Sequence, residues 1–144
     1  MSPDDLFIRE FEAGRWPLEK WHHSDHIKLA YLYLMRYSFD EAAAKLRDRI
    51  RAHNAAHNLP DLPTSGYHET MTQAWLHLVD LVIREYGPSD NADLFLEQHP
   101  ELSQKKTLRL FYSRERFMSP EAKVRFVPPD LTPLPRSQRT GGAA

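Results

Sequence analysis

The sequence predicts an all-α protein, a single bundle of five to six helices, and three observations support this. Apolar residues recur at helical spacing along most of the chain, and the alternation of apolar and polar residues that is typical of strands is absent. Valine, isoleucine and threonine are sparse, and only five glycines occur. A length of 144 residues allows a sizeable core and fits one domain.

Three helices are expected in the first half of the chain. Ser2 and Pro3 are typical of a helix start, and Gly14 is typical of a helix end. The third helix should begin after Ser38, because Asp40 and Glu41 would then lie in its first turn. The expected bounds are 3–12, then 24–37 with an earlier start at residue 17 as an alternative, then 39–57.

The second half of the chain begins with a loop. Prolines and a glycine in "NLPDLPTSG" predict this loop at 58–66, and Gly87-Pro88 is a strong end signal for a fourth helix. We expect that helix at 67–86, followed by two shorter helices near 90–98 and 104–112.

The C-terminal region is rich in proline and cannot continue a helix. We expect an extended strap from Pro128 to Pro135 that packs on the bundle. The domain should therefore span residues 1–135, with a flexible tail at 136–144.

Composition narrows the possible partners. The formal net charge is −1 with histidine neutral, which gives no electrostatic case for nucleic acid or an anionic membrane. The absence of cysteine excludes disulfides, thiolate metal sites and cysteine nucleophiles. No signal peptide or membrane-spanning run is visible. We expect a cytoplasmic protein that acts on a small molecule.

Histidines are concentrated at the expected helix ends. Six of the eight lie between positions 22 and 68. Short connections make consecutive helices antiparallel neighbours, so the start of the second helix, the end of the third and the start of the fourth should meet. His23, His26, His57 and His68 are then expected to converge at one end of the bundle.

A cluster of neutral imidazoles suits a divalent transition metal, because histidine is its commonest ligand. The sequence therefore predicts a mononuclear site for iron, copper or zinc on His23, His26 and His68, with His57 as a fourth group. Glu69 is a candidate ligand or general base. Tyr112 is a candidate catalytic residue if its segment folds over the site.

Other interpretations of these residues remain open. His53 and His57 are also suited to binding the exposed carbonyls at a helix end, and His68 to capping the fourth helix. His77 and His99 are expected to be surface or packing residues. Basic and aromatic residues alternate in "RLFYSRERF" at 109–117, but the near-zero net charge favours an amphipathic helix and turn over a nucleic-acid strip.

Several motifs together resemble a group of small, all-helical bacterial proteins of unassigned function. The motifs are W-x-H-x-x-H, Y-H-E-T, Y-S-x-E and P-D-L-x-P-L-P, which here fall at 21–26, 67–70, 112–115 and 129–135. The resemblance spans most of the chain. It implies that the tail belongs to the fold and that His23, His26 and His68 are motif residues, but it implies no activity.

A metal-dependent enzyme is the leading functional prediction, with an oxidoreductase favoured because open metal positions suit oxygen activation. A zinc-type hydrolase or lyase with Glu69 as base is an alternative. A non-catalytic metal or small-molecule sensor is another. A structural helical protein whose histidines are caps is the third.

Overall fold

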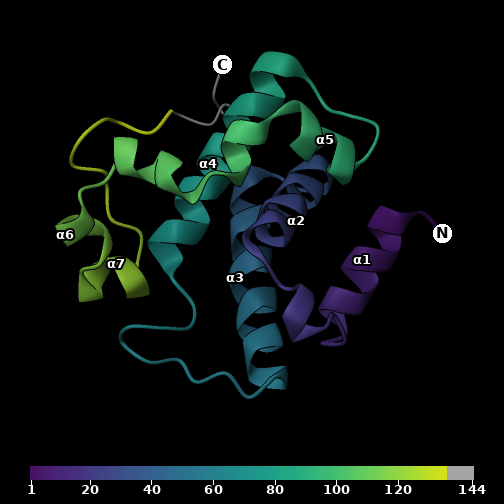
Figure 1. Ribbon diagram of the computed structural model, residues 1–144, viewed down its shortest axis with the longest axis horizontal. Helices are drawn as coiled ribbons and strands as arrows, with labels where there is room; N and C mark the ends of the chain where they lie inside the picture. The colour runs from purple at the N-terminus through teal and green to yellow at the C-terminus, as the bar shows by residue number, and fades with distance from the viewer. Residues whose placement is uncertain (136–144) are drawn as a thin grey trace.

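The computed structural model describes residues 1–135, and this part of the chain is helical with no β-strand (Figure 1). The prediction of an all-α bundle is confirmed. The flexible tail expected at 136–144 lies outside the described residues. The helices are α1 (Pro3–Glu12), α2 (His23–Arg36), α3 (Phe39–Ala56), α4 (Glu69–Tyr86), α5 (Ala92–Gln98), α6 (Arg114–Phe117) and α7 (Pro120–Val124), and the 3₁₀ turns are η1 (Leu18–Lys20), η2 (Pro100–Ser103) and η3 (Lys105–Leu110).

Local capping explains where the long helices begin and end. Ser2 and Ser38 each accept a hydrogen bond from a backbone N–H in the first turn of the following helix, at 3.1 and 3.2 Å. Gly87 ends α4 with a positive φ of 81°, which a residue with a side chain would rarely adopt. The bounds expected from the sequence for α1, α2, α3 and α4 therefore hold to within two residues.

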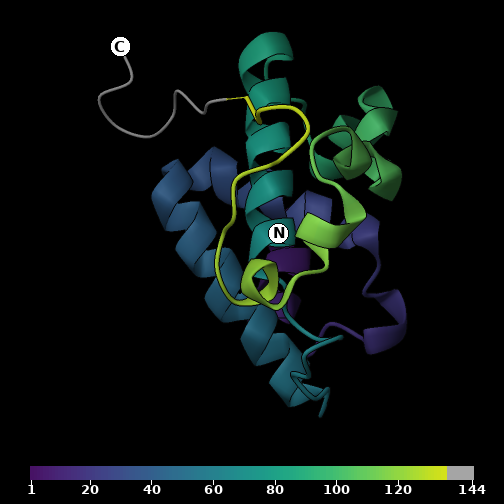
Figure 2. The ribbon, with the colours of Figure 1, turned by 90° about the vertical axis from the view of Figure 1, so that its left-hand side faces the viewer.

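The centre of the molecule consists of α2, α3 and α4, which pack against one another. Helix α1 packs on α3, and α5 packs on α2, on the side away from α6 and α7 (Figure 1). The short helices α6 and α7 lie beside α4, with α7 in contact with it (Figure 2). This arrangement places the start of α2 and the first turns of α4 in the same part of the bundle.

The core is built from the apolar faces of these helices. Burial of these side chains is the main driving force for folding, at about 25 cal/mol per Å² of apolar surface. On α3, Ala43, Leu46, Ile50 and His53 recur at helical spacing and are buried. On α4 the same is true of Trp75, Leu78 and Val82. The helical periodicity therefore identified both core faces.

Residues 104–124 differ from the sequence expectation. The helix expected at 104–112 is the 3₁₀ turn η3, and two further short helices, α6 and α7, follow it. Only Leu108 of η3 is buried, so this segment lacks the apolar stripe that would hold a longer α-helix against the core. Ser113 and Ser119 cap the two short helices.

The segment after α7 returns to the body of the protein. Thr70 on α4 donates its hydroxyl to the Arg125 carbonyl at 2.9 Å and accepts from the Val127 N–H at 3.1 Å. The Leu131 N–H donates to the Phe111 carbonyl at 2.9 Å. The strap as a whole, to Pro135, stays a prediction.

Within residues 1–135 no helix is long and apolar enough to cross a membrane.

Candidate ligand-binding cleft

Two of the expected metal ligands, His23 and His57, donate hydrogen bonds to backbone carbonyls, and so does His53. His23 Nε2 donates to the Leu102 carbonyl at 2.9 Å. His57 Nε2 donates to the Trp16 carbonyl at 2.9 Å, and His53 Nε2 donates to the same oxygen at 2.9 Å. A carbonyl only accepts, so each of these ring nitrogens carries a proton and has no lone pair for a metal.

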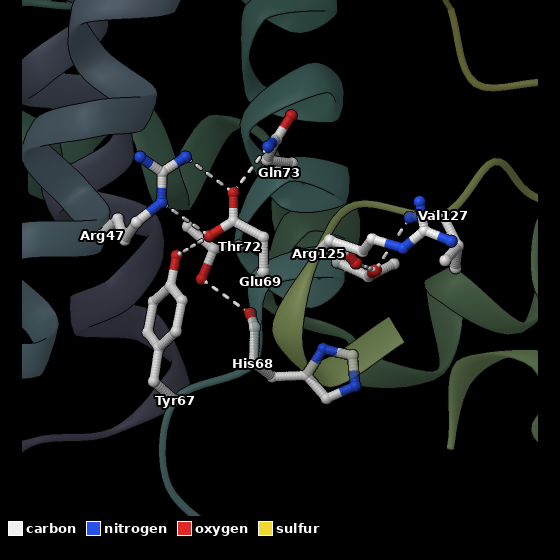
Figure 3. A network of polar contacts seen from close by, with 9 residues as sticks. Arg47, Tyr67, His68, Glu69, Thr72, Gln73, Arg125 and Val127 are labelled. Atoms are coloured by element: carbon white, nitrogen blue, oxygen red, sulfur yellow. Dashed lines mark hydrogen bonds and ion pairs between the residues drawn. The ribbon is translucent and has the colours of Figure 1, made fainter. Parts of the chain in front are cut away.

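His68 caps α4. Its Nδ1 accepts from the Met71 N–H at 3.0 Å, its Nε2 donates to the Phe117 carbonyl at 3.0 Å, and its ring stacks on Phe117 with centroids 4.6 Å apart. Both nitrogens are therefore occupied. Figure 3 shows the ring turned away from the Glu69 carboxylate. His68 is therefore the N-terminal cap of α4, as the alternative interpretation of this residue expected.

The expected convergence of four imidazoles is not present. Within residues 1–135 no group of three or more histidine, aspartate or glutamate side chains is placed to hold a metal ion. Two of the predicted ligands do remain together, because His23 and His26 line one small cavity between α2, α3 and α4. His57 and His68 lie elsewhere, at Trp16 and Phe117.

Glu69 is the centre of a buried ion-pair network (Figure 3). Arg47 donates to its two oxygens at 2.9 and 2.8 Å, and Tyr67 and Gln73 donate at 2.7 and 2.6 Å. Burial alone would raise the pKa of Glu69, but the hydrogen bonds from Arg47, Gln73 and Tyr67 outweigh it and lower the pKa to about 2. Such a carboxylate is a weak base, and it fixes α4 to α3.

Tyr112 is buried, and its hydroxyl is occupied by a backbone group. The hydroxyl donates to the Val127 carbonyl at 2.6 Å, and burial raises the pKa of Tyr112 to about 12. Tyr112 nevertheless lines the largest hollow described below. Its hydrogen bond positions the C-terminal segment.

A cleft of about 670 Å³ lies between α4, η3 and α6. This volume falls within the usual range for small-molecule sites, roughly 300–1,000 Å³. The lining residues are Met71, Trp75, Lys105, Lys106, Leu108, Arg109, Tyr112, Ser113, Arg114, Phe117, Met118 and Leu131.

Charge in the cleft is of one sign. Lys105, Lys106, Arg109 and Arg114 are exposed, none of the lining residues is acidic, and none of these four cations forms an ion pair within the described part of the chain. Some arginine and lysine side chains elsewhere pair with carboxylates, as Arg47 does with Glu69. The cleft therefore combines an apolar lining with a local excess of positive charge.

The sequence contained a signal for this cleft, but the near-zero net charge of the whole chain argued against giving it weight. The basic and aromatic stretch at 109–117 contributes Arg109, Tyr112, Ser113, Arg114 and Phe117 to the lining. An amphipathic helix and a turn were expected for this stretch, and the structure has the end of 3₁₀ turn η3, a break at 111–113 and the short helix α6 there.

The small cavity that His23 and His26 line adjoins the cleft. It has a volume of about 20 Å³, and Met71 and Trp75 line both hollows. Burial, with smaller contributions from the nearby His23 and Lys105, lowers the pKa of His26 to about 3. Burial also lowers the pKa of His23. Both imidazoles are therefore neutral near pH 7.

Comparisons with known proteins give no match: no family model, no curated protein and no solved structure is similar to this chain. The resemblance to small all-helical bacterial proteins stays a prediction. The geometry of the cleft is therefore the feature from which a function can be inferred.

Proposed function

We propose that this protein binds a small organic anion with an apolar body, and that the cleft between α4, η3 and α6 is its binding site. The observation that carries this proposal is the coincidence of an apolar lining with four cations that have no carboxylate partner among residues 1–135. This is the small-molecule binding module that the sequence allowed as an alternative to an enzyme.

The two kinds of lining residue have separate tasks. Trp75 and Phe117 offer aromatic surface, and burial of an apolar ligand body against them supplies affinity. Lys106 and Arg109 lie exposed on η3, where they favour a carboxylate or phosphate group. The ligand would thus place its apolar part against α4 and its anionic group at η3.

Naphthyl phosphate and naphthol form a suitable pair of probes, because they share the apolar body and differ in charge. We expect naphthyl phosphate to bind more tightly to the protein at low salt. The preference should shrink as salt is added, because exposed charges are screened. Calorimetric titration at several salt concentrations measures both effects. Equal affinity for the two probes would contradict the proposal, and tighter binding of a short single-stranded DNA would favour a nucleic-acid ligand instead.

Removing two cleft cations should weaken binding of naphthyl phosphate. Each exposed ion pair contributes about 0.2–1 kcal/mol, so the double variant Lys106→Gln/Arg109→Gln should lose about 2- to 30-fold in affinity. The control Arg9→Gln/Lys45→Gln changes net charge equally on α1 and α3, outside the cleft. An equal loss in the control would show that overall charge, and not the cleft, determines binding.

The metal-dependent enzyme is a second candidate, which one observation favours: His23 and His26 line the same cavity as neutral imidazoles. A metal there would need further ligands from the bound molecule. Elemental analysis of the purified protein after metal-replete expression tests this candidate. A stoichiometric metal that is lost in His26→Leu but retained in His57→Leu would support it, and a protein without metal would exclude it.

A further inference from the structure

The cavity beside the cleft has few polar lining residues. His23, His26 and Thr72 are its polar lining residues, and the others are apolar. The Thr72 hydroxyl donates to the His68 carbonyl at 3.0 Å, so it can only accept from a further group, whereas the two imidazoles can supply both donors and acceptors. A volume of about 20 Å³ admits one water-sized group.

The tautomer of His23 follows from its hydrogen bond. Because Nε2 donates to the Leu102 carbonyl, Nε2 carries the proton, and Nδ1 is an acceptor in the neutral ring. The ring is held 4.6 Å from the Trp75 ring, centroid to centroid. His23 thus offers a fixed acceptor next to a residue of the cleft.

His26 is half-buried, and its ring nitrogens can still form hydrogen bonds. Its ring stacks on Trp21 with centroids 4.1 Å apart, and among residues 1–135 its ring nitrogens have no hydrogen-bond partner. A neutral imidazole has one donor and one acceptor nitrogen. His26 can therefore form hydrogen bonds with a group from outside the chain that enters the cavity.

We infer that the cavity of His23 and His26 is the inner subsite of the cleft and takes a single hydroxyl group at the end of the ligand opposite its anionic group. A hydroxyl both donates and accepts, so it can donate to an imidazole lone pair while it accepts from the N–H of His26. This inference rests on the proposed function of the cleft.

Access to the subsite depends on the two residues that both hollows share. Trp75 is buried and its ring is packed against His23, whereas Met71 is half-buried and has a flexible side chain. Because Met71 lines both hollows, a change of its rotamer would join the subsite to the cleft. The size of the cavity restricts the inner group to about one non-hydrogen atom.

Two matched probes test the inference, phenylpropanoate and its para-hydroxy analogue, which differ by one hydroxyl. One net hydrogen bond corresponds to about 2- to 12-fold in affinity, so the wild-type protein should prefer the hydroxy probe by that factor. The variant His26→Leu should lose the preference and still bind phenylpropanoate. The control His22→Gln, at an exposed neighbouring position, should retain it.

A second measurement keeps the test decisive if His26→Leu does not fold. In the wild-type protein the imidazole nitrogen resonances of His26 should move with the hydroxy probe and stay in place with phenylpropanoate. Equal affinity for both probes, or equal nitrogen shifts, would refute the proposed subsite but would not contradict ligand binding in the cleft. Failure of both probes and of naphthyl phosphate to bind would instead refute the proposed function itself.

Discussion

The free energy of unfolding should fall by about 1.4 kcal/mol for each pH unit between pH 6.5 and about 3 because of His26 alone. Burial lowers the pKa of this side chain from 6.5 to about 3. In that window the unfolded chain binds a proton that the folded protein does not bind. Stability therefore increases with pH and is lost on acidification, by about 5 kcal/mol over the whole window.

Other histidines should act in the same direction. Burial is the main cause of a lowered pKa for four of them, so acid favours the unfolded chain at each: His23, His53, His68 and His77. Glu69 acts only at lower pH, because its stabilising effect is present above 4.5 and is lost as the pH falls towards 2.

Urea unfolding at about pH 7 and about pH 4.5 measures the effect of His26 before Glu69 contributes. Wild-type protein should lose about 3 kcal/mol more between these two conditions than His26→Leu. His22→Gln, at an exposed position, should behave as the wild type does. The same pH dependence in wild type and His26→Leu would show that His26 is accessible to protons in the folded protein.

Replacement of Arg47 by leucine should lower the free energy of unfolding at neutral pH by about 3 kcal/mol. Breaking a buried ion pair by removing one partner costs roughly 3–5 kcal/mol, and the lower value applies because the Arg47 side chain is 36% exposed. The variant leaves the Glu69 carboxylate, which is only 7% exposed, without its charge partner. Denaturant unfolding measures the loss.

A surface ion pair provides the matched control. Arg36 and Asp5 are 42% and 50% exposed, so Arg36→Leu should cost no more than about 1 kcal/mol. The difference between wild type and Arg47→Leu should also narrow below about pH 4.5, where the stabilising effect of ionised Glu69 is lost. A cost at Arg47 as small as that at Arg36 would contradict the described network.

The bounds of α1 to α4 and the buried faces of α3 and α4 were predictable because local signals determine them. Serine caps and Gly87 fix the helix ends, and apolar spacing identifies the buried faces of α3 and α4. Short connections predicted that consecutive helices are antiparallel neighbours, which brings His26 near the first turns of α4. His26 and Met71 indeed line the same cavity.

Side-chain directions at the candidate metal site were not predictable. His68 Nε2 binds the carbonyl of Phe117, which lies 49 residues away in the sequence, and His57 binds Trp16, 41 residues away. No local pattern in the sequence indicates such acceptors. Each of these carbonyls occupies an imidazole nitrogen that the metal hypothesis had assigned to a metal ion.

The cleft was missed because its signals are not periodic. Its basic residues come from a 3₁₀ turn and a four-residue helix, and a net charge of −1 averages a local excess of four positive charges with acidic residues elsewhere. The arrangement of Lys105, Lys106, Arg109 and Arg114 beside Trp75 arises only when η3 folds against α4. A scan of charge in short windows would have marked this stretch.

Mapping the binding site of naphthyl phosphate by amide NMR shifts shows whether the cleft between α4, η3 and α6 binds a small organic anion. With increasing probe, the Trp75 indole N–H and the backbone amides of Leu108 and Phe117 should shift together and saturate, because these residues line the cleft. Shifts confined to the open hollow at Tyr37 and Glu41, or no shift at all at high probe concentration, would contradict the account.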